Sequence, residues 1–130
     1  MGSAIRKYEH GLQHIGIPCS SMEETAAYYE KLGFEIKYRS SVNGQPVCFL
    51  QLDDLMIEAY QESPVAQRDG AINHFSIDVS DIEAAFAEAK KMGLALCDDH
   101  VNFLPFWENG VRFFTVTGPD MERIEFCQKL

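Results

Sequence analysis

The sequence has no apolar run long enough to cross a membrane and no secretion signal; its first residues, 1–11, are polar. We expect this segment to be a short leader or a tag remnant. Basic residues are scarce, because 11 Lys and Arg stand against 20 Asp and Glu and give a net charge of -9. This balance disfavours nucleic acid and membrane surfaces as partners and is typical of a solvated acidic surface.

Cysteine is also sparse. The four cysteines, at positions 19, 48, 97 and 127, form no Cys-x-x-Cys pair. We therefore expect free thiols in a reducing compartment, and so a cytoplasmic protein. What remains is a chain of 130 residues with 46% hydrophobic and 24% charged residues, which suffices for one compact domain with its own core.

An internal duplication organises the chain. Residues 72–94 repeat residues 12–34 at a constant offset of 60, with 7 identities in 23 positions. A second match, at an offset of 67, relates Ile57-Glu58 to Ile124-Glu125. The change of offset means that the second half carries 7 extra residues, which we place in residues 100–110.

Each half predicts the same order of elements, βαβββ. In the first half, alternation predicts a strand over residues 12–17, which Pro18 either ends or confines to a sheet edge. Ser20 and Glu23 have capping-box spacing and predict a helix that ends at Gly33. The other predicted strands of this half are residues 34–39, 46–52 and 55–61.

The second half repeats this plan after a polar linker at residues 62–70. Ser80 and Glu83 again form a capping box, and Gly93 again ends the helix. The predicted strands are residues 72–79, 94–98, 111–117 and 123–127. The prediction is thus an α+β fold, one domain over residues 1–130, with modules at residues 12–61 and 72–128.

The extra segment is unusually apolar for a loop, since it contains Phe103, Phe106 and Trp107. We consider two interpretations. The segment is a lid or wall over a small-molecule cavity, or it packs on the core or at a dimer contact.

Four polar residues occupy equivalent places in the two halves: His14 and His74 on the first strands, and Glu58 and Glu125 on the last. Their neighbours in each strand are apolar and suit the face that packs on the helix, so these four side chains should share the other face. The negative charges of two carboxylates in a cleft repel each other and lose hydration, and a divalent cation would balance them. Imidazole with carboxylate suits Ni, Zn, Co, Mn or Fe(II).

Several motifs resemble the vicinal oxygen chelate superfamily, which includes glyoxalase I, methylmalonyl-CoA epimerase, extradiol dioxygenases and fosfomycin- and bleomycin-resistance proteins. The resemblance spans residues 12–128, and its motifs are His14-Ile15-Gly16-Ile17, Tyr28-Tyr29-Glu30-Lys31-Leu32-Gly33-Phe34, Ile57-Glu58, His74-Phe75-Ser76-Ile77 and Gly118-Pro119-Asp120 with Ile124-Glu125-Phe126. It implies a glyoxalase-like fold, in which the paired modules form a cupped mixed β-sheet around a central cleft that holds a divalent metal. It also implies a homodimer, and the metal site forms either within one chain or between two swapped chains.

The ligand set His14, Glu58, His74 and Glu125 is similar to that of glyoxalase I. This similarity implies a metal-dependent lyase or isomerase that moves a proton on a small α-hydroxycarbonyl substrate. Glu125 would be the proton shuttle, and Glu58 a ligand or second base. The alternatives are an extradiol-type dioxygenase, an epimerase, and a metal-free binding or antibiotic-resistance protein of the same fold.

Two features disfavour glutathione as part of the substrate. The stretch at residues 16–19 lacks the arginine that bacterial glyoxalase I carries just beyond its first metal histidine, and the aromatic segment is no glutathione signature. Arg112 and Arg123 are the basic residues expected nearest the cleft, where each either holds an anionic group or serves the surface.

Overall fold

The computed structural model describes residues 3–130 of the chain. Most of the segment expected to be a leader is therefore described, and it contains one short 3-10 helix, η1 (Ala4–Tyr8). Met1 and Gly2 lie outside the described residues. No helix among residues 3–130 is both long and apolar enough to cross a membrane.

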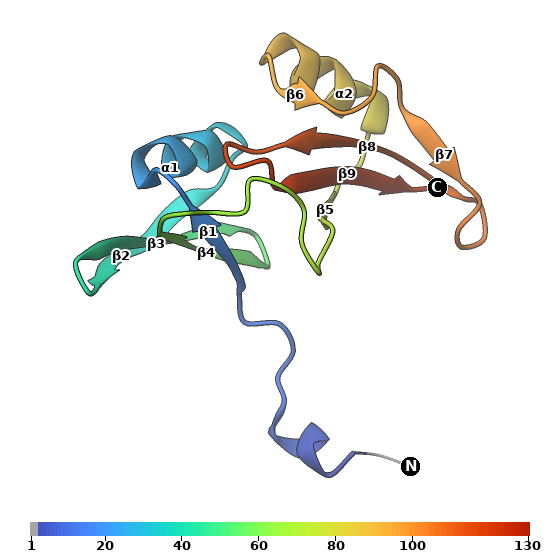
Figure 1. The fold of residues 1–130 in the computed structure, drawn as a ribbon. Coiled ribbons are helices and arrows are strands. Elements are labelled where there is room, and N and C mark those ends of the chain that lie inside the picture. Colours follow the sequence, from blue (N-terminus) through green and yellow to red (C-terminus); the bar gives the residue numbers. More distant parts are fainter. Residues whose placement is uncertain (1–2) are drawn as a thin grey trace. The chain divides into compact units, whose positions relative to one another are not determined.

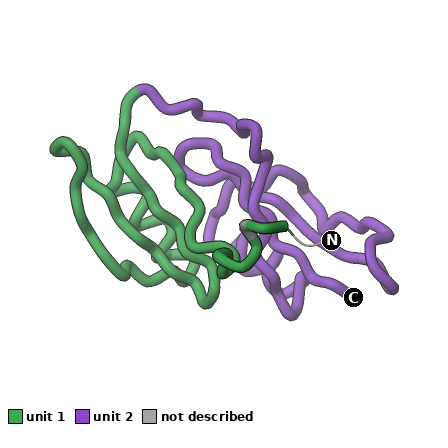
Figure 2. The backbone as a smooth tube through the Cα atoms, turned by 90° about the horizontal axis from the view of Figure 1, so that it is seen from below, with its two compact units in different colours: residues 1–63 green, residues 64–130 purple. Residues whose placement is uncertain are grey.

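The chain divides into two compact units, residues 1–63 and 64–130 (Figure 2). The first contains β1 (Ile15–Cys19), α1 (Met22–Lys31), β2 (Glu35–Val42), β3 (Gln45–Leu52) and β4 (Leu55–Gln61). Its strands form one sheet in the order β1-β4-β3-β2 (Figure 1). β1 runs parallel to β4 and the other pairs are antiparallel, so the sheet is mixed.

The second unit repeats this arrangement with β5 (Phe75–Asp78), α2 (Ile82–Lys91), β6 (Ala95–Leu96), β7 (Asn102–Leu104), β8 (Val111–Thr117) and β9 (Arg123–Lys129). The order is β5-β9-β8-β6, β7 also pairs with β8, and only β5 and β9 are parallel. The predicted α+β class, with a repeated module and mixed sheets, is confirmed.

The first strand of each unit begins later than predicted. β1 starts at Ile15 and β5 at Phe75, so His14 and His74 each precede a strand by one residue. Pro18 does not end β1 but lies inside it. β1 is an edge strand, which tolerates the missing N–H of proline, as the second of our two alternatives predicted.

The predicted capping boxes are wrong by one residue. The N-caps are Ser21, which accepts a hydrogen bond from the Glu24 backbone N–H at 3.3 Å, and Asp81, which accepts one from that of Ala84 at 3.1 Å. The reason lies in the next residue of each helix. Met22 and Ile82 are buried at 5% and 1% exposure, and their burial fixes the register of the helix start.

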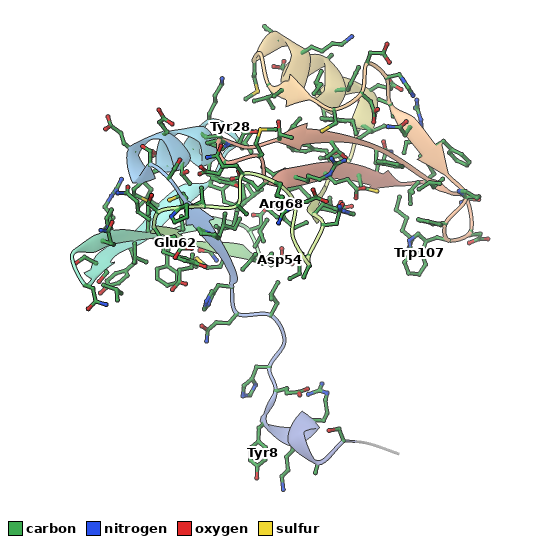
Figure 3. The ribbon with its side chains drawn as sticks, in the orientation of Figure 1. Tyr8, Tyr28, Asp54, Glu62, Arg68 and Trp107 are labelled. Atoms are coloured by element: carbon green, nitrogen blue, oxygen red, sulfur yellow. The ribbon has the colours of Figure 1, made fainter. Side chains whose placement is uncertain are left out.

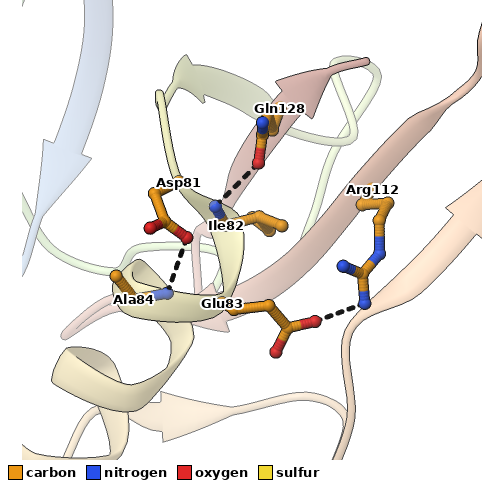
Figure 4. A network of polar contacts seen from close by, with 6 residues as sticks. All are labelled: Asp81, Ile82, Glu83, Ala84, Arg112 and Gln128. Carbon is orange, nitrogen blue, oxygen red and sulfur yellow. Dashed lines mark hydrogen bonds and ion pairs between the residues drawn. The ribbon is translucent and has the colours of Figure 1, made fainter.

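A glutamine from the last strand of each unit also fixes the helix start. Gln61 Oε1 accepts from the Met22 backbone N–H at 2.8 Å, and Gln128 Oε1 accepts from that of Ile82 at 2.9 Å (Figure 4). Each bond satisfies one of the backbone donors that a helix start leaves free. The duplication therefore includes this tertiary contact.

The core of each unit lies between its helix and its sheet. In the first unit, Tyr29 of α1 and Ile57 of β4 are fully buried. In the second, Phe114 and Ile124 of the sheet are at 0% exposure, and the Phe86 ring of α2 packs on the Phe114 ring at a centroid distance of 5.2 Å. Each helix is followed, as predicted, by a glycine in the left-handed region directly after its C-cap, at positions 33 and 93, whose φ angles are +105° and +73°.

The predicted loop at residues 100–110 is partly wrong, because it contains β7. β6 has only two residues and pairs with the last part of β8, which leaves the first part of β8 open at that edge. β7 pairs there in antiparallel register, with Phe103 opposite Arg112.

Candidate metal centre

The first candidate pair lies where β1 joins β4. Glu58 stands in β4 between Ile57 and Ala59, which are fully buried. Its side chain points to the other face of the sheet and is 31% exposed. Because β1 is parallel to β4 with Gly16 opposite Glu58, the chain enters β1 beside that carboxylate. His14 Nε2 lies 3.9 Å from Glu58 Oε1.

The second pair repeats this geometry. Glu125 follows the fully buried Ile124 in β9, and Ser76 of β5 lies opposite it. His74 Nε2 lies 3.7 Å from Glu125 Oε1, and the Glu125 side chain is 17% exposed. The residues beside the two carboxylates differ, because Phe49 on β3 stands opposite Glu58, whereas Thr115 on β8 stands opposite Glu125. The Phe49 ring packs edge-on against the His14 ring at 5.8 Å.

The two distances are informative. Both exceed the 2.7–3.2 Å range of an N–H···O hydrogen bond. Two donors at about 2.0–2.2 Å from one metal can be no more than about 4.3 Å apart. Each pair therefore lies within the reach of one metal ion, and its donors, imidazole and carboxylate, are common ligands of divalent transition metals.

Each unit by itself supplies two of the four predicted ligands. Within either unit, residues 3–130 contain no group of three or more His, Cys, Asp and Glu side chains placed to hold a metal ion. In this part of the chain, the ion-pair partner of each carboxylate within 4 Å is its own histidine. Among the described residues, neither glutamate thus has a lysine or arginine within 4 Å.

A cavity of about 490 Å³ lies beside Glu58 in the first unit. It is lined by Gly16, Val42, Asn43, Gln45, Val47, Glu58, Tyr60, Gln61 and Glu62. Burial raises the pKa of the Tyr60 hydroxyl, and the charges of Glu62 and Glu58 raise it further. Tyr60 therefore remains a hydrogen-bond donor, and the lining offers two carboxylates but no basic side chain.

Arg123 and Cys127 share the sheet face of Glu125, because they stand two positions before and two positions after it in β9. Burial raises the pKa of the Cys127 thiol, and the Glu125 and Asp78 charges add to this effect, so Cys127 stays protonated. The Nε of Arg123 is buried and has no hydrogen-bond partner among the described residues. A role for Arg123 in holding an anionic group stays a prediction.

Arg112 lies on the opposite face from Glu125. It stands across from Gln128, whose side chain reaches the start of α2, and its guanidinium pairs with Glu83 of that helix (Figure 4). This ion pair with α2 gives Arg112 a structural role that needs no bound ligand.

The aromatic side chains of the extra segment are exposed. Phe103, Phe106 and Trp107 have exposures of 57%, 54% and 73%, so the interpretation that they pack on the core is wrong. Trp107 extends from the connection between β7 and β8 (Figure 3), and the Lys129 ammonium lies 4.3 Å from its ring centre. A lid or dimer contact stays a prediction.

Two residues beside the histidines were missed in the sequence. His14 Nδ1 lies 3.0 Å from Gln13 Oε1, and His74 Nδ1 lies 2.8 Å from Asn73 Oδ1. Both positions obey the offset of 60, and both carry a side-chain amide. That shared chemistry was the signal available in the sequence.

The family model described as the glyoxalase/bleomycin resistance protein/dioxygenase superfamily matches residues 13–114. The chain belongs to this superfamily. The matched range contains His14, Glu58 and His74, whereas Glu125 lies beyond it.

Individual relatives agree with this membership. The uncharacterized protein YwbC of Bacillus subtilis (strain 168) is 32% identical over 127 residues, which cover 91% of this chain and 97% of that protein. The glyoxalase family protein from Enterococcus faecalis has a similar structure, with a TM-score of 0.78, 20% identity, and coverage of 92% of this chain and 98% of that one. The fosfomycin resistance protein FosX from Listeria monocytogenes, complexed with Mn(II) and sulfate ion, has a TM-score of 0.72, 16% identity, and coverage of 92% and 93%. At these identities the two structures show that the superfamily fold is shared.

Proposed function

We propose that His14, Glu58, His74 and Glu125 together bind one divalent cation, such as Ni, Zn, Co, Mn or Fe(II). The observation that supports this proposal is the repeated pair: each unit places a histidine Nε2 3.7–3.9 Å from a glutamate oxygen at equivalent strand positions. Imidazole nitrogens and carboxylate oxygens are ligands that such ions accept, and an ion that takes more than four ligands would keep room for substrate. The Mn(II) in the structure of FosX, which shares this fold, also supports the proposal.

We further propose that the protein is a lyase or isomerase of glyoxalase I type. A bound cation would act as a Lewis acid on the neighbouring oxygens of an α-hydroxycarbonyl substrate. The chain itself would supply the proton transfer, with Glu125 taking the proton from the carbon beside the carbonyl and returning it to the adjacent carbon. Glu58 would serve as ligand or second base. A carboxylate suits this role when it lies within hydrogen-bond reach of the proton.

The cavity beside Glu58 supports an uncharged substrate. Its lining includes the carboxylates of Glu58 and Glu62 and polar groups from Asn43, Gln45 and Tyr60. An anionic conjugate, such as one of glutathione, would be repelled by these carboxylates. A small hydroxyketone would instead find hydrogen-bond partners. The superfamily resemblance also supports a homodimer, with the cation site formed within one chain or between two.

The test begins with protein purified without chelators and analysed for metal content. We expect about one divalent ion per chain. Metal-loaded protein is then mixed with dihydroxyacetone in D2O, and we expect deuterium to enter at the carbon beside the carbonyl. Glu125→Gln should abolish this exchange while keeping a native circular dichroism spectrum. Glu30→Gln, on the exposed side of α1, is the matched control.

Protein that contains no metal, and that binds none of Ni, Zn or Mn when these are added, would contradict the metal centre. Exchange that continues unchanged in Glu125→Gln would contradict the assigned proton shuttle.

A further inference from the structure

We propose that Gln13 and Asn73 are positioning residues that hold His14 and His74 in the tautomer with the proton on Nδ1. Nε2, the nitrogen nearer the glutamate, then carries no proton and can bind a metal through its lone pair. The tautomer follows from contacts within the protein. Its consequence for metal affinity rests on the proposed function.

The contact in the first unit is direct. The Gln13 Oε1 atom can only accept a hydrogen bond, so the His14 Nδ1, 3.0 Å away, must donate. In a neutral imidazole the other nitrogen then has no proton. That nitrogen is Nε2, which lies 3.9 Å from Glu58 Oε1.

The second unit has the same contact and one more. Asn73 Oδ1 lies 2.8 Å from His74 Nδ1, and Asn73 Nδ2 donates to Asp69 Oδ2 at 2.6 Å. Because its amide nitrogen binds a carboxylate, Asn73 must turn its oxygen toward the histidine. Asp69 thus fixes the orientation of the Asn73 amide, and Asn73 fixes which ring nitrogen of His74 carries the proton.

This control matters because an unconstrained histidine side chain favours the proton on Nε2, which would block that nitrogen as a ligand. Metal-binding histidines generally donate their second ring nitrogen to an oxygen that fixes the tautomer and ring orientation. Here two amides of different length achieve the same result at equivalent positions. The protein thus presents two prepared nitrogen ligands before any cation binds.

The test uses metal-free protein labelled with 15N, at a pH where the histidines are neutral. Long-range 1H–15N spectra report which ring nitrogen is protonated. We expect protonated Nδ1 and unprotonated Nε2 in both His14 and His74. Gln13→Met, which removes the acceptor, should shift His14 toward the Nε2–H form and leave His74 unchanged. Asn73→Leu should do the reverse, so each variant is the control for the other.

Conservative replacement separates positioning from a packing effect. Gln13→Glu keeps an acceptor oxygen and should keep His14 protonated on Nδ1, whereas Gln13→Met should not. Both substitutions lie in an exposed segment, so the circular dichroism spectrum should stay native. Competition with a chelating dye for Zn²⁺ should show about tenfold weaker binding by Gln13→Met than by the wild type.

The outcomes distinguish this inference from the proposed function. The inference would be overturned if the same ring nitrogens of His14 and His74 were protonated in the wild type, Gln13→Met and Asn73→Leu, even if the protein binds Zn²⁺. Tautomer shifts in a protein that binds no Zn²⁺ would support the positioning roles and contradict the metal centre.

Discussion

At the scale of single residues, neither Glu58 nor Glu125 has a lysine or arginine within 4 Å in the described part of the chain. Glu58 and Glu125 are only 31% and 17% exposed, and each has a histidine at 3.7–3.9 Å as its ion-pair partner. Removing a carboxylate from water without balancing its charge is unfavourable. A cation that binds the folded protein should therefore stabilise it.

The stabilisation should increase with the concentration of the cation. Zn²⁺ at one hundred times its dissociation constant should raise the free energy of unfolding by about 2.7 kcal/mol, because the ion binds only the folded state. Chelation with EDTA should reverse the gain, and Glu125→Gln should lose most of it. Urea unfolding with and without Zn²⁺ measures both. An equal gain in Glu125→Gln would show that the ion binds elsewhere.

A second residue-scale prediction concerns the exposed pair of Asp99 and His100, whose side chains lie 2.7 Å apart. The hydrogen bond to Asp99 raises the pKa of His100 above its ordinary 6.5, and the same bond lowers the pKa of Asp99 below its ordinary 3.8. The pair is fully present between those two values. It is lost as pH rises through the raised pKa of His100, or falls through the lowered pKa of Asp99.

Histidine NMR titration of the wild type and Asp99→Asn checks this. We expect the pKa of His100 to be lower in the variant than in the wild type. A His100 titration that is identical in both proteins would contradict the contact.

At the scale of elements, a few residues decide where each helix begins. Apolar periodicity predicted both helices, and glycine predicted both ends. The N-caps were predicted one residue too early, because Ser20 and Ser21 are equally good caps. Tertiary contacts made the choice: burial of Met22, and the hydrogen bond from its backbone N–H to Gln61. Such contacts join residues far apart in the sequence and leave no local pattern.

Loss of either glutamine should destabilise the fold. Gln61→Ala and Gln128→Ala each leave a backbone N–H of a part-buried helix start without its partner, at a cost of about 1–3 kcal/mol in the free energy of unfolding. Gln51→Ala is the matched control, since its amide donates to an exposed turn carbonyl of Asp53, and we expect a change within about 0.5 kcal/mol. Denaturant unfolding of the three variants measures this. Equal costs at all three positions would contradict the account.

At the scale of the whole molecule, the duplication was the strongest signal in the sequence. Two constant offsets predicted the repeated module and the residues of both His–Glu pairs, and the superfamily resemblance implied the mixed sheet. Alternation placed each glutamate on the face away from its helix, as the full burial of Ile57 and Ile124 beside them shows. β7 was not predicted, because its three residues pair only where β6 leaves β8 open. The amides beside the histidines were missed because their role depends on ring orientation.

The central claim is that both pairs share one cation, and zinc stoichiometry tests it most directly. Equilibrium dialysis against Zn²⁺, followed by elemental analysis, would compare the wild type, His14→Ala, His74→Ala and the double variant. The account predicts about one ion per chain in the wild type and almost none in either single variant, because each pair alone supplies only two ligands. Two ions per chain in the wild type, falling to one in each single variant, would show two independent sites and contradict it.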